Sequence, residues 1–167
     1  GYLYYYDERD RCIKKKLPGC EPIYYVYDRC NYLVLKQDGN DREAGRWQSF
    51  QYDRLGRQVI WGFINQNRPH ADWIRICKNQ NLSIYFRGAS YGSENYGYTP
   101  VHRISHLCTP LIINYYDNYE YTTIFNEFIG FLNRPGYYSS FSASSLTSRD
   151  KLTGQVVALL NDPSKRD

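Results

Sequence analysis

Alternating apolar and polar positions recur along the chain and predict β-strands. The clearest case is residues 71–88, where two β-rich runs flank the polar residues 78–81. Trp73 and Cys77 alternate with Ile74 and Ile76 in the first run, and Leu82 begins a similar alternation in the second. This pattern predicts an antiparallel hairpin with one buried and one hydrated face. We expect the hairpin to lie at the centre of the sheet.

Other segments rich in aromatic and β-branched residues predict further strands. Residues 37–41 contain Asp-Gly and predict a turn, and residues 53–56 predict another. Gly62 interrupts one strand and indicates a bulge or a close backbone approach. No internal repeat of useful length is evident. The additional strands are predicted at residues 2–6, 23–36 (one bent strand or two), 47–52 and 57–64.

A single amphipathic helix is predicted at residues 123–133. Its apolar positions recur at helical spacing, and Arg134-Pro135-Gly136 ends it. Residues 101–116 fit either a strand or a short helix. The sequence therefore predicts one mainly β domain over residues 1–167, an antiparallel barrel or sandwich with this helix packed against it.

Tyrosine dominates the composition. The 167 residues include 19 Tyr and no Met, and the formal net charge is +4. So mild a charge does not indicate a nucleic-acid-binding surface, and nucleic acid is the less favoured partner. The basic residues at 9–16 are interpreted as a hydrated loop. No apolar run approaches 18 residues, so no membrane-spanning segment is expected.

Five cysteines without Cys-x-x-Cys spacing favour a secreted protein with disulfides over a zinc site. The chain does not begin with Met, and Asn81-Leu82-Ser83 is a glycosylation sequon. We therefore expect a processed, secreted form. Two disulfides are predicted, Cys77–Cys108 and one within the first thirty residues, among Cys12, Cys20 and Cys30.

A tyrosine-rich surface is the favoured functional feature. Tyr rings flanked by Gly, Ser and Asn combine contact area with adaptable hydrogen bonding. The function expected is a secreted, non-enzymatic binding protein of the effector, toxin, virulence or salivary type, acting on a host protein or a small ligand. No cofactor is implied. The expected binding residues are Tyr91, Tyr96, Tyr98, Tyr115, Tyr116 and Tyr119.

A secreted ribonuclease-like enzyme is the first alternative. Acid–base cleavage of RNA needs a His paired with Glu or a second His, and an Arg for the phosphate. His70, His102, Glu43 and Arg57 supply these residue types. A metal site at His102 and His106 is not predicted, because Arg103 stands where a metalloprotease motif requires Glu.

The second alternative comes from two separated segments, residues 85–88 (Tyr-Phe-Arg-Gly) and the Ser-rich residues 138–146. Their order resembles the ADP-ribosyltransferase pattern, in which an Arg on an early strand and a Ser-Thr-Ser strand hold NAD. The resemblance implies a toxin enzyme with Arg87 in that role. This sequence departs from the pattern, because Ala143 replaces the Thr and no Glu follows Ser144.

Overall fold

The computed structural model describes residues 1–88, 96–99, 102–117 and 148–157. Its strands are β1 (Leu3–Tyr6), β2 (Cys12–Lys16), β3 (Ile23–Tyr27), β4 (Leu33–Gln37), β5 (Trp47–Tyr52), β6 (Gln58–Ile64), β7 (Tyr85–Phe86), β8 (Tyr98–Thr99), β9 (Cys108–Asp117) and β10 (Ser148–Val157). Its helices are α1 (Gly39–Glu43), α2 (His70–Cys77) and α3 (Arg103–His106).

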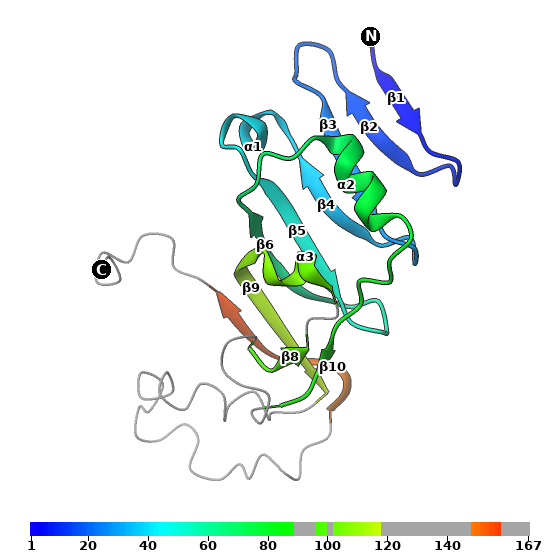
Figure 1. The fold of residues 1–167 in the computed structure, drawn as a ribbon. Helices are drawn as coiled ribbons and strands as arrows, with labels where there is room; N and C mark the ends of the chain where they lie inside the picture. The colour runs from blue at the N-terminus through cyan, green and yellow to red at the C-terminus, as the bar shows by residue number, and fades with distance from the viewer. Residues whose placement is uncertain (89–95, 100–101, 118–147, 158–167) are drawn as a thin grey trace, which may run out of the picture.

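Eight of these strands form one twisted antiparallel sheet, in the order β1-β2-β3-β4-β5-β6-β9-β10 (Figure 1). β7 and β8 form a separate two-stranded sheet. The mainly antiparallel β architecture is confirmed. The barrel prediction is wrong, because β1 and β10 are the two ends of an open sheet and do not pair with each other. One large sheet also replaces the two facing sheets of a sandwich.

Most of the predicted strands are present. The aromatic run at the start is β1, residues 47–52 are β5, and residues 57–64 contain β6. Residues 23–36 divide into β3 and β4 at a turn that begins at Asp28. Residues 101–116 contain both elements considered for them, α3 and then β9. The helix predicted at residues 123–133 lies outside the described residues, and the single-domain assignment stays a prediction.

The prediction of a hairpin at residues 71–88 is wrong. The first arm is helix α2, and only the short strand β7 forms in the second. Trp73, Ile74, Ile76 and Cys77 alternate, but their spacing also places them on one side of a helix. Pro69 is the N-cap residue of α2, and its carbonyl accepts the hydrogen bond from the N–H of Trp73 that begins the helix. α2 packs on β3 and crosses one face of the sheet (Figure 1).

Three hairpins of the sheet have turns of the same kind. Each begins with an Asp that follows a Tyr, and the Asp backbone N–H donates to the carbonyl four residues later, at 3.0 Å in every case. The Asp carboxylate accepts the backbone N–H of that same fourth residue. The residue before it has a positive φ. The three Asp residues are Asp7, Asp28 and Asp53, and the positive-φ residues are Asp10, Asn31 and Gly56.

Gly62 is required where β6 meets β9. A Cβ added at Gly62 would lie 2.1 Å from the carbonyl oxygen of Thr109, far inside van der Waals contact. The register between β6 and β9 also shifts between Trp61 and Gly62. The predicted bulge and close backbone approach are therefore both confirmed.

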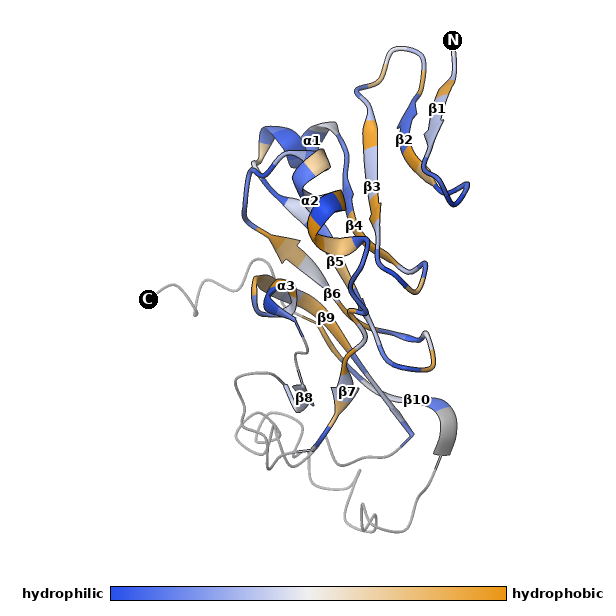
Figure 2. Ribbon diagram, turned by 45° about the vertical axis from the view of Figure 1, so that its right-hand side comes forward, coloured by the Kyte–Doolittle hydropathy of each residue, from blue (hydrophilic) through white to orange (hydrophobic). Residues whose placement is uncertain are grey.

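Apolar side chains gather in two clusters, and Figure 2 shows hydrophobic and polar residues alternating along the strands that supply them. The first cluster lies between α2 and the sheet and centres on Trp47 and Trp73. The second joins β6 and β9 to the small sheet through Tyr98 and Tyr115. No helix in the described part of the chain is long and apolar enough to cross a membrane.

The predicted disulfides are not supported. All five cysteines lie in the described residues, and each is a free thiol. Cys77 is on α2, not on a hairpin arm, and its side chain is enclosed in the first core cluster. Burial raises the pKa of Cys77 to about 12 and also raises the pKa of Cys108. Cys20 and Cys30 are exposed, and Cys12 is half-buried.

Alkylation without reductant, followed by mass spectrometry, should modify all five cysteines of the denatured chain. In the folded protein, Cys20 and Cys30 should react first, because they are exposed. Cys77 should be protected, because it is buried and its raised pKa leaves almost no thiolate. One labelled thiol in the denatured chain would instead support the two disulfides predicted from the sequence.

Candidate functional site

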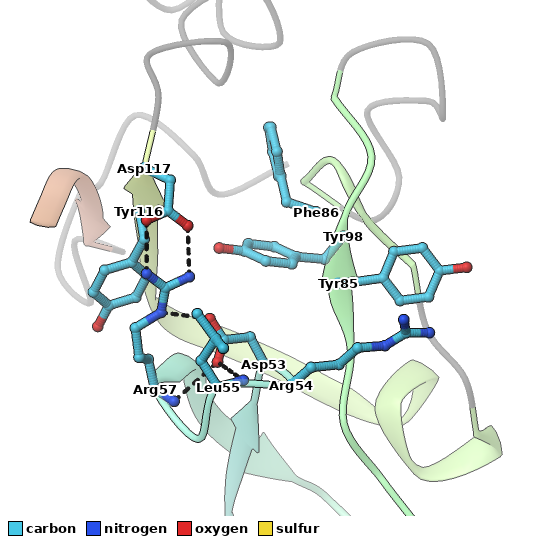
Figure 3. Close-up of a pocket in the computed structure, with 9 residues that line it drawn as sticks. All are labelled: Asp53, Arg54, Leu55, Arg57, Tyr85, Phe86, Tyr98, Tyr116 and Asp117. Atoms are coloured by element: carbon cyan, nitrogen blue, oxygen red, sulfur yellow. Dashed lines mark hydrogen bonds and ion pairs between the residues drawn. The ribbon is translucent and has the colours of Figure 1, made fainter. Parts of the chain in front are cut away.

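One cavity in the described part of the chain lies beside the β5–β6 turn and has a volume of about 250 Å³ (Figure 3). Arg57 is its central charged group. The guanidinium donates to both carboxylate oxygens of Asp117, at 2.8 and 2.7 Å, and to Asp53 at 2.6 Å. These carboxylates raise the pKa of Arg57. The residues that line this cavity, called here the Arg57 cavity, are Asp53, Arg54, Leu55, Arg57, Tyr85, Phe86, Tyr98, Tyr116 and Asp117.

The aromatic groups of the Arg57 cavity also have partners within the protein. The Tyr98 hydroxyl donates to the carbonyl of Asn114 at 2.6 Å, and Tyr116 donates to the carbonyl of Gln58. On the other side of the cavity, Arg54 lies over the ring of Tyr85 (Figure 3). Arg57 therefore links the β5–β6 turn to the end of β9 through Asp53 and Asp117, and the hydroxyls of Tyr98 and Tyr116 are bonded to backbone carbonyls.

The tyrosines expected to form a binding surface do not all lie at the surface. Tyr98 and Tyr115 are only 4% and 2% exposed, and their rings stack in the second core cluster. The Tyr115 hydroxyl donates to the carbonyl of Tyr96. Tyr96 and Tyr116 are half-buried, whereas Tyr91 and Tyr119 lie outside the described residues. Tyr98 and Tyr115 are therefore part of the core.

The second cavity lies beside the start of α2 and has a volume of about 560 Å³. Three of its lining residues are cationic, Lys14, Arg42 and Arg68, and no Asp or Glu is among the lining residues. Lys14 and Arg68 form no ion pair with any described residue. The basic cavity, as it is called below, is lined by Lys14, Tyr24, Gln37, Arg42, Asn67, Arg68, Pro69, His70 and Ala71.

Strand register and helix packing bring these residues together. Lys14 pairs with Tyr24 across β2 and β3, and Tyr24 pairs with Gln37 across β3 and β4, so the three share one face. The segment that begins α2 is anchored over this face by two hydrogen bonds. The Trp47 indole N–H donates to the carbonyl of Arg68 at 3.3 Å, and His70 Nε2 bonds the carbonyl of Tyr25 at 2.9 Å.

The first turn of α2 adds hydrogen-bond donors. Its N-cap residue, Pro69, makes no side-chain capping hydrogen bond. The Pro69 carbonyl accepts from the N–H groups of Asp72 and Trp73. The first N–H groups of a helix have no partner within it, and they carry partial positive charge. His70 and Ala71 supply these groups at the wall of the basic cavity.

Arg42 contributes a positive charge that is only weakly neutralised by a nearby carboxylate. Its two terminal nitrogens are buried and have no hydrogen-bond partner. Glu21 Oε2 lies 3.6 Å from Nη2, but the Glu21 side chain is 77% exposed. The guanidinium instead lies over the ring of Tyr24, 4.9 Å from its centroid. A buried guanidinium without hydrogen bonds favours an anion nearby.

His70 is a neutral residue in this cavity. Its ring stacks on Tyr24 at 4.7 Å, and burial lowers its pKa, with a further contribution from Lys14. Because a neutral imidazole must donate from Nε2 to reach the Tyr25 carbonyl, Nδ1 is an acceptor. The lining residues offer no second histidine or carboxylate to complete an acid–base pair. The basic cavity is therefore suited to binding an anion rather than to proton transfer.

The four residues considered for ribonuclease chemistry do not share a cavity. His70 lines the basic cavity, and Arg57 lines the other. Glu43 is exposed at the end of α1, and His102 caps α3 by accepting from the N–H of Ile104. Within the described residues, no cluster of three His, Cys, Asp or Glu could hold a metal ion.

The residues that resemble the ADP-ribosyltransferase pattern are only partly described. Arg87 donates to the hydroxyl of Tyr85 and lies over its ring. The Ser-rich residues 138–146 lie outside the described residues. Comparison of the chain with protein-family models, curated proteins and solved structures finds no match.

The lowered pKa of His70 predicts a loss of stability in acid. As the pH falls through about 6.5, the unfolded chain binds a proton that the native His70 resists, so the free energy of unfolding decreases. Urea midpoints measured between about pH 7.5 and pH 5.5 should therefore fall more in the wild type than in His70→Gln. His106→Gln, at an exposed position, is the control and should behave as wild type. Equal pH dependence in all three proteins would contradict the account of His70.

Proposed function

We propose that this protein is a binding protein whose basic cavity holds an anionic group of its ligand, with phosphate as the best match. The observation that carries the proposal is the lining of this cavity, which combines Lys14, Arg42 and Arg68 with no carboxylate. Gathering three cations with only the exposed Glu21 as a counter-charge is unfavourable in the empty protein. A bound anion would relieve that repulsion.

Phosphate suits the donors that surround the cavity. Lys14 supplies an ammonium group, Arg68 supplies a guanidinium, and the start of α2 supplies backbone N–H groups. A phosphate has several acceptor oxygens that can bond these donors at the same time. Helix N-termini that carry free N–H groups are common phosphate-binding positions. The cationic side chains provide attraction that the helix alone does not.

The size of the basic cavity indicates a ligand larger than one inorganic ion. Its volume of about 560 Å³ falls within the range of about 300–1,000 Å³ that is usual for sites that bind organic ligands. Tyr24 and His70 also add aromatic groups to its lining. A polyphosphate or a phosphorylated organic molecule fits both features.

This proposal keeps one part of the function expected from the sequence and changes another. The sequence predicts a non-enzymatic protein that binds a host protein or a small ligand through a tyrosine-rich surface. The basic cavity lies instead at the start of α2. Secretion and an effector or toxin role stay predictions on which this proposal does not depend.

Isothermal titration with sodium tripolyphosphate tests the proposal. The wild-type protein should bind one equivalent. Lys14→Gln and Arg68→Gln should each weaken binding about tenfold, since a hydrogen bond to a charged group contributes about 1.5 kcal/mol or more. Both substitutions keep a long polar side chain, so the fold should be retained.

Two variants serve as matched controls. Lys15→Gln removes the neighbouring lysine of β2, which pairs with Tyr4 and not with the cavity residues. Arg75→Gln removes an exposed arginine of α2 that pairs with Asp72. Both should bind tripolyphosphate within about twofold of wild type, which is the range expected of screened surface charges. Equal weakening in all four variants, or no saturable binding, would refute the proposal.

A further inference from the structure

We propose that the ligand of the basic cavity is a single-stranded nucleic acid, with a phosphate in the cavity and an adjacent base stacked on Tyr5. The inference rests on the proposed function and names the class of ligand. It comes from a row of residues that leads from the open edge of the sheet into the cavity. The sequence alone does not show this row, because the strand register brings its residues together.

The row crosses four strands. Tyr5 on β1 pairs with Lys14 on β2, Lys14 pairs with Tyr24 on β3, and Tyr24 pairs with Gln37 on β4. Lys14 Nζ lies 4.9 Å from the centroid of the Tyr5 ring and 5.7 Å from that of Tyr24. Three strand spacings make the row about 14 Å long, longer than a single phosphate group requires.

Tyr5 is the aromatic residue of this row whose ring is exposed enough for a base to stack on it. Its side chain is on the edge strand, and the residue is 46% exposed. Tyr24 is unsuitable, because His70 stacks on its ring and Arg42 lies over it. A base on Tyr5 would lie next to the Lys14 ammonium group, which can contact its phosphate.

Positive charge continues on the same face beyond Lys14. Lys16 is two residues further along β2 and pairs with Leu3, so it lies on the side of the sheet that carries Tyr5. The acidic turn between β1 and β2 is at the other end of the hairpin, where Asp7 is bound by Arg11. A stacking ring beside a line of cations is the usual arrangement in proteins that bind single strands.

Fluorescence anisotropy with labelled decamers of uridine and of thymidine tests the inference, with tripolyphosphate as the ligand that lacks bases. Tyr5→Leu should weaken decamer binding about tenfold, within the range of base–aromatic stacking. The same substitution should change tripolyphosphate affinity by less than about twofold, because Tyr5 does not line the basic cavity. Lys14→Gln should weaken both ligands, and it should reduce the slope of log affinity against log salt by about 0.7 for a decamer.

Tyr4→Leu is the matched control. Tyr4 adjoins Tyr5 on β1, is also 46% exposed, and has its own lysine, with Lys15 Nζ 5.9 Å from its ring centroid. It differs in lying on the opposite face of the sheet, because successive side chains of a strand alternate. Tyr4→Leu should bind the decamers within about twofold of wild type, as expected of a residue that stacks no base.

The outcomes separate this inference from the proposed function. A decamer affinity that depends on Tyr5 and not on Tyr4 supports both, and the two decamers show whether RNA or DNA is preferred. Two results would overturn the nucleic-acid inference alone, provided that tripolyphosphate binding depends on Lys14. The first is that the decamers bind no more tightly than tripolyphosphate. The second is that Tyr5→Leu and Tyr4→Leu weaken decamer binding equally. Failure of tripolyphosphate and both decamers to bind would overturn the proposed function as well.

Discussion

The basic cavity depends on the packing of Trp73 against Trp47. Both side chains are almost fully buried, and their rings meet edge to face at 6.5 Å between centroids. This contact seats α2 on the sheet, and each tryptophan contributes a large buried apolar area. The chain just before α2 is then held by the hydrogen bond from Trp47 to the Arg68 carbonyl. Helix packing thus places Arg68 and His70 opposite strand residues that are distant in the sequence.

The two cavities differ in how their charges are balanced. In the Arg57 cavity, Asp53 and Asp117 bind the guanidinium directly, so a further anion would have to displace a carboxylate. In the basic cavity, Lys14 and Arg68 lack such partners among the described residues. Buried ion pairs that satisfy each other stabilise a particular local structure, whereas unbalanced charge at a cavity attracts a ligand. The second arrangement is therefore the one assigned to binding.

Local signals in the sequence were sufficient for the strands but not for the site. Aromatic and β-branched runs located most strands, and Gly62 correctly indicated a close approach of β6 and β9. The spacing of the apolar residues from Trp73 to Cys77 fits a helix as well as an alternating strand. A short apolar run can satisfy both patterns, so the pattern alone does not distinguish them. The turn at residues 53–56 was also predicted, but only the hydrogen bonds show that Asp7, Asp28 and Asp53 begin the same kind of turn. Lys14 and Arg68 could not have been associated, because only the strand register and the seating of α2 bring them together.

Diffraction from crystals soaked in sodium tungstate tests most directly whether the basic cavity is an anion site. Tungstate resembles phosphate in shape and charge, and its anomalous signal locates it independently of the protein. The account predicts a peak between Lys14, Arg68 and the first turn of α2, absent from crystals of Lys14→Gln. An empty basic cavity, with tungstate bound elsewhere on the same molecule, would contradict it.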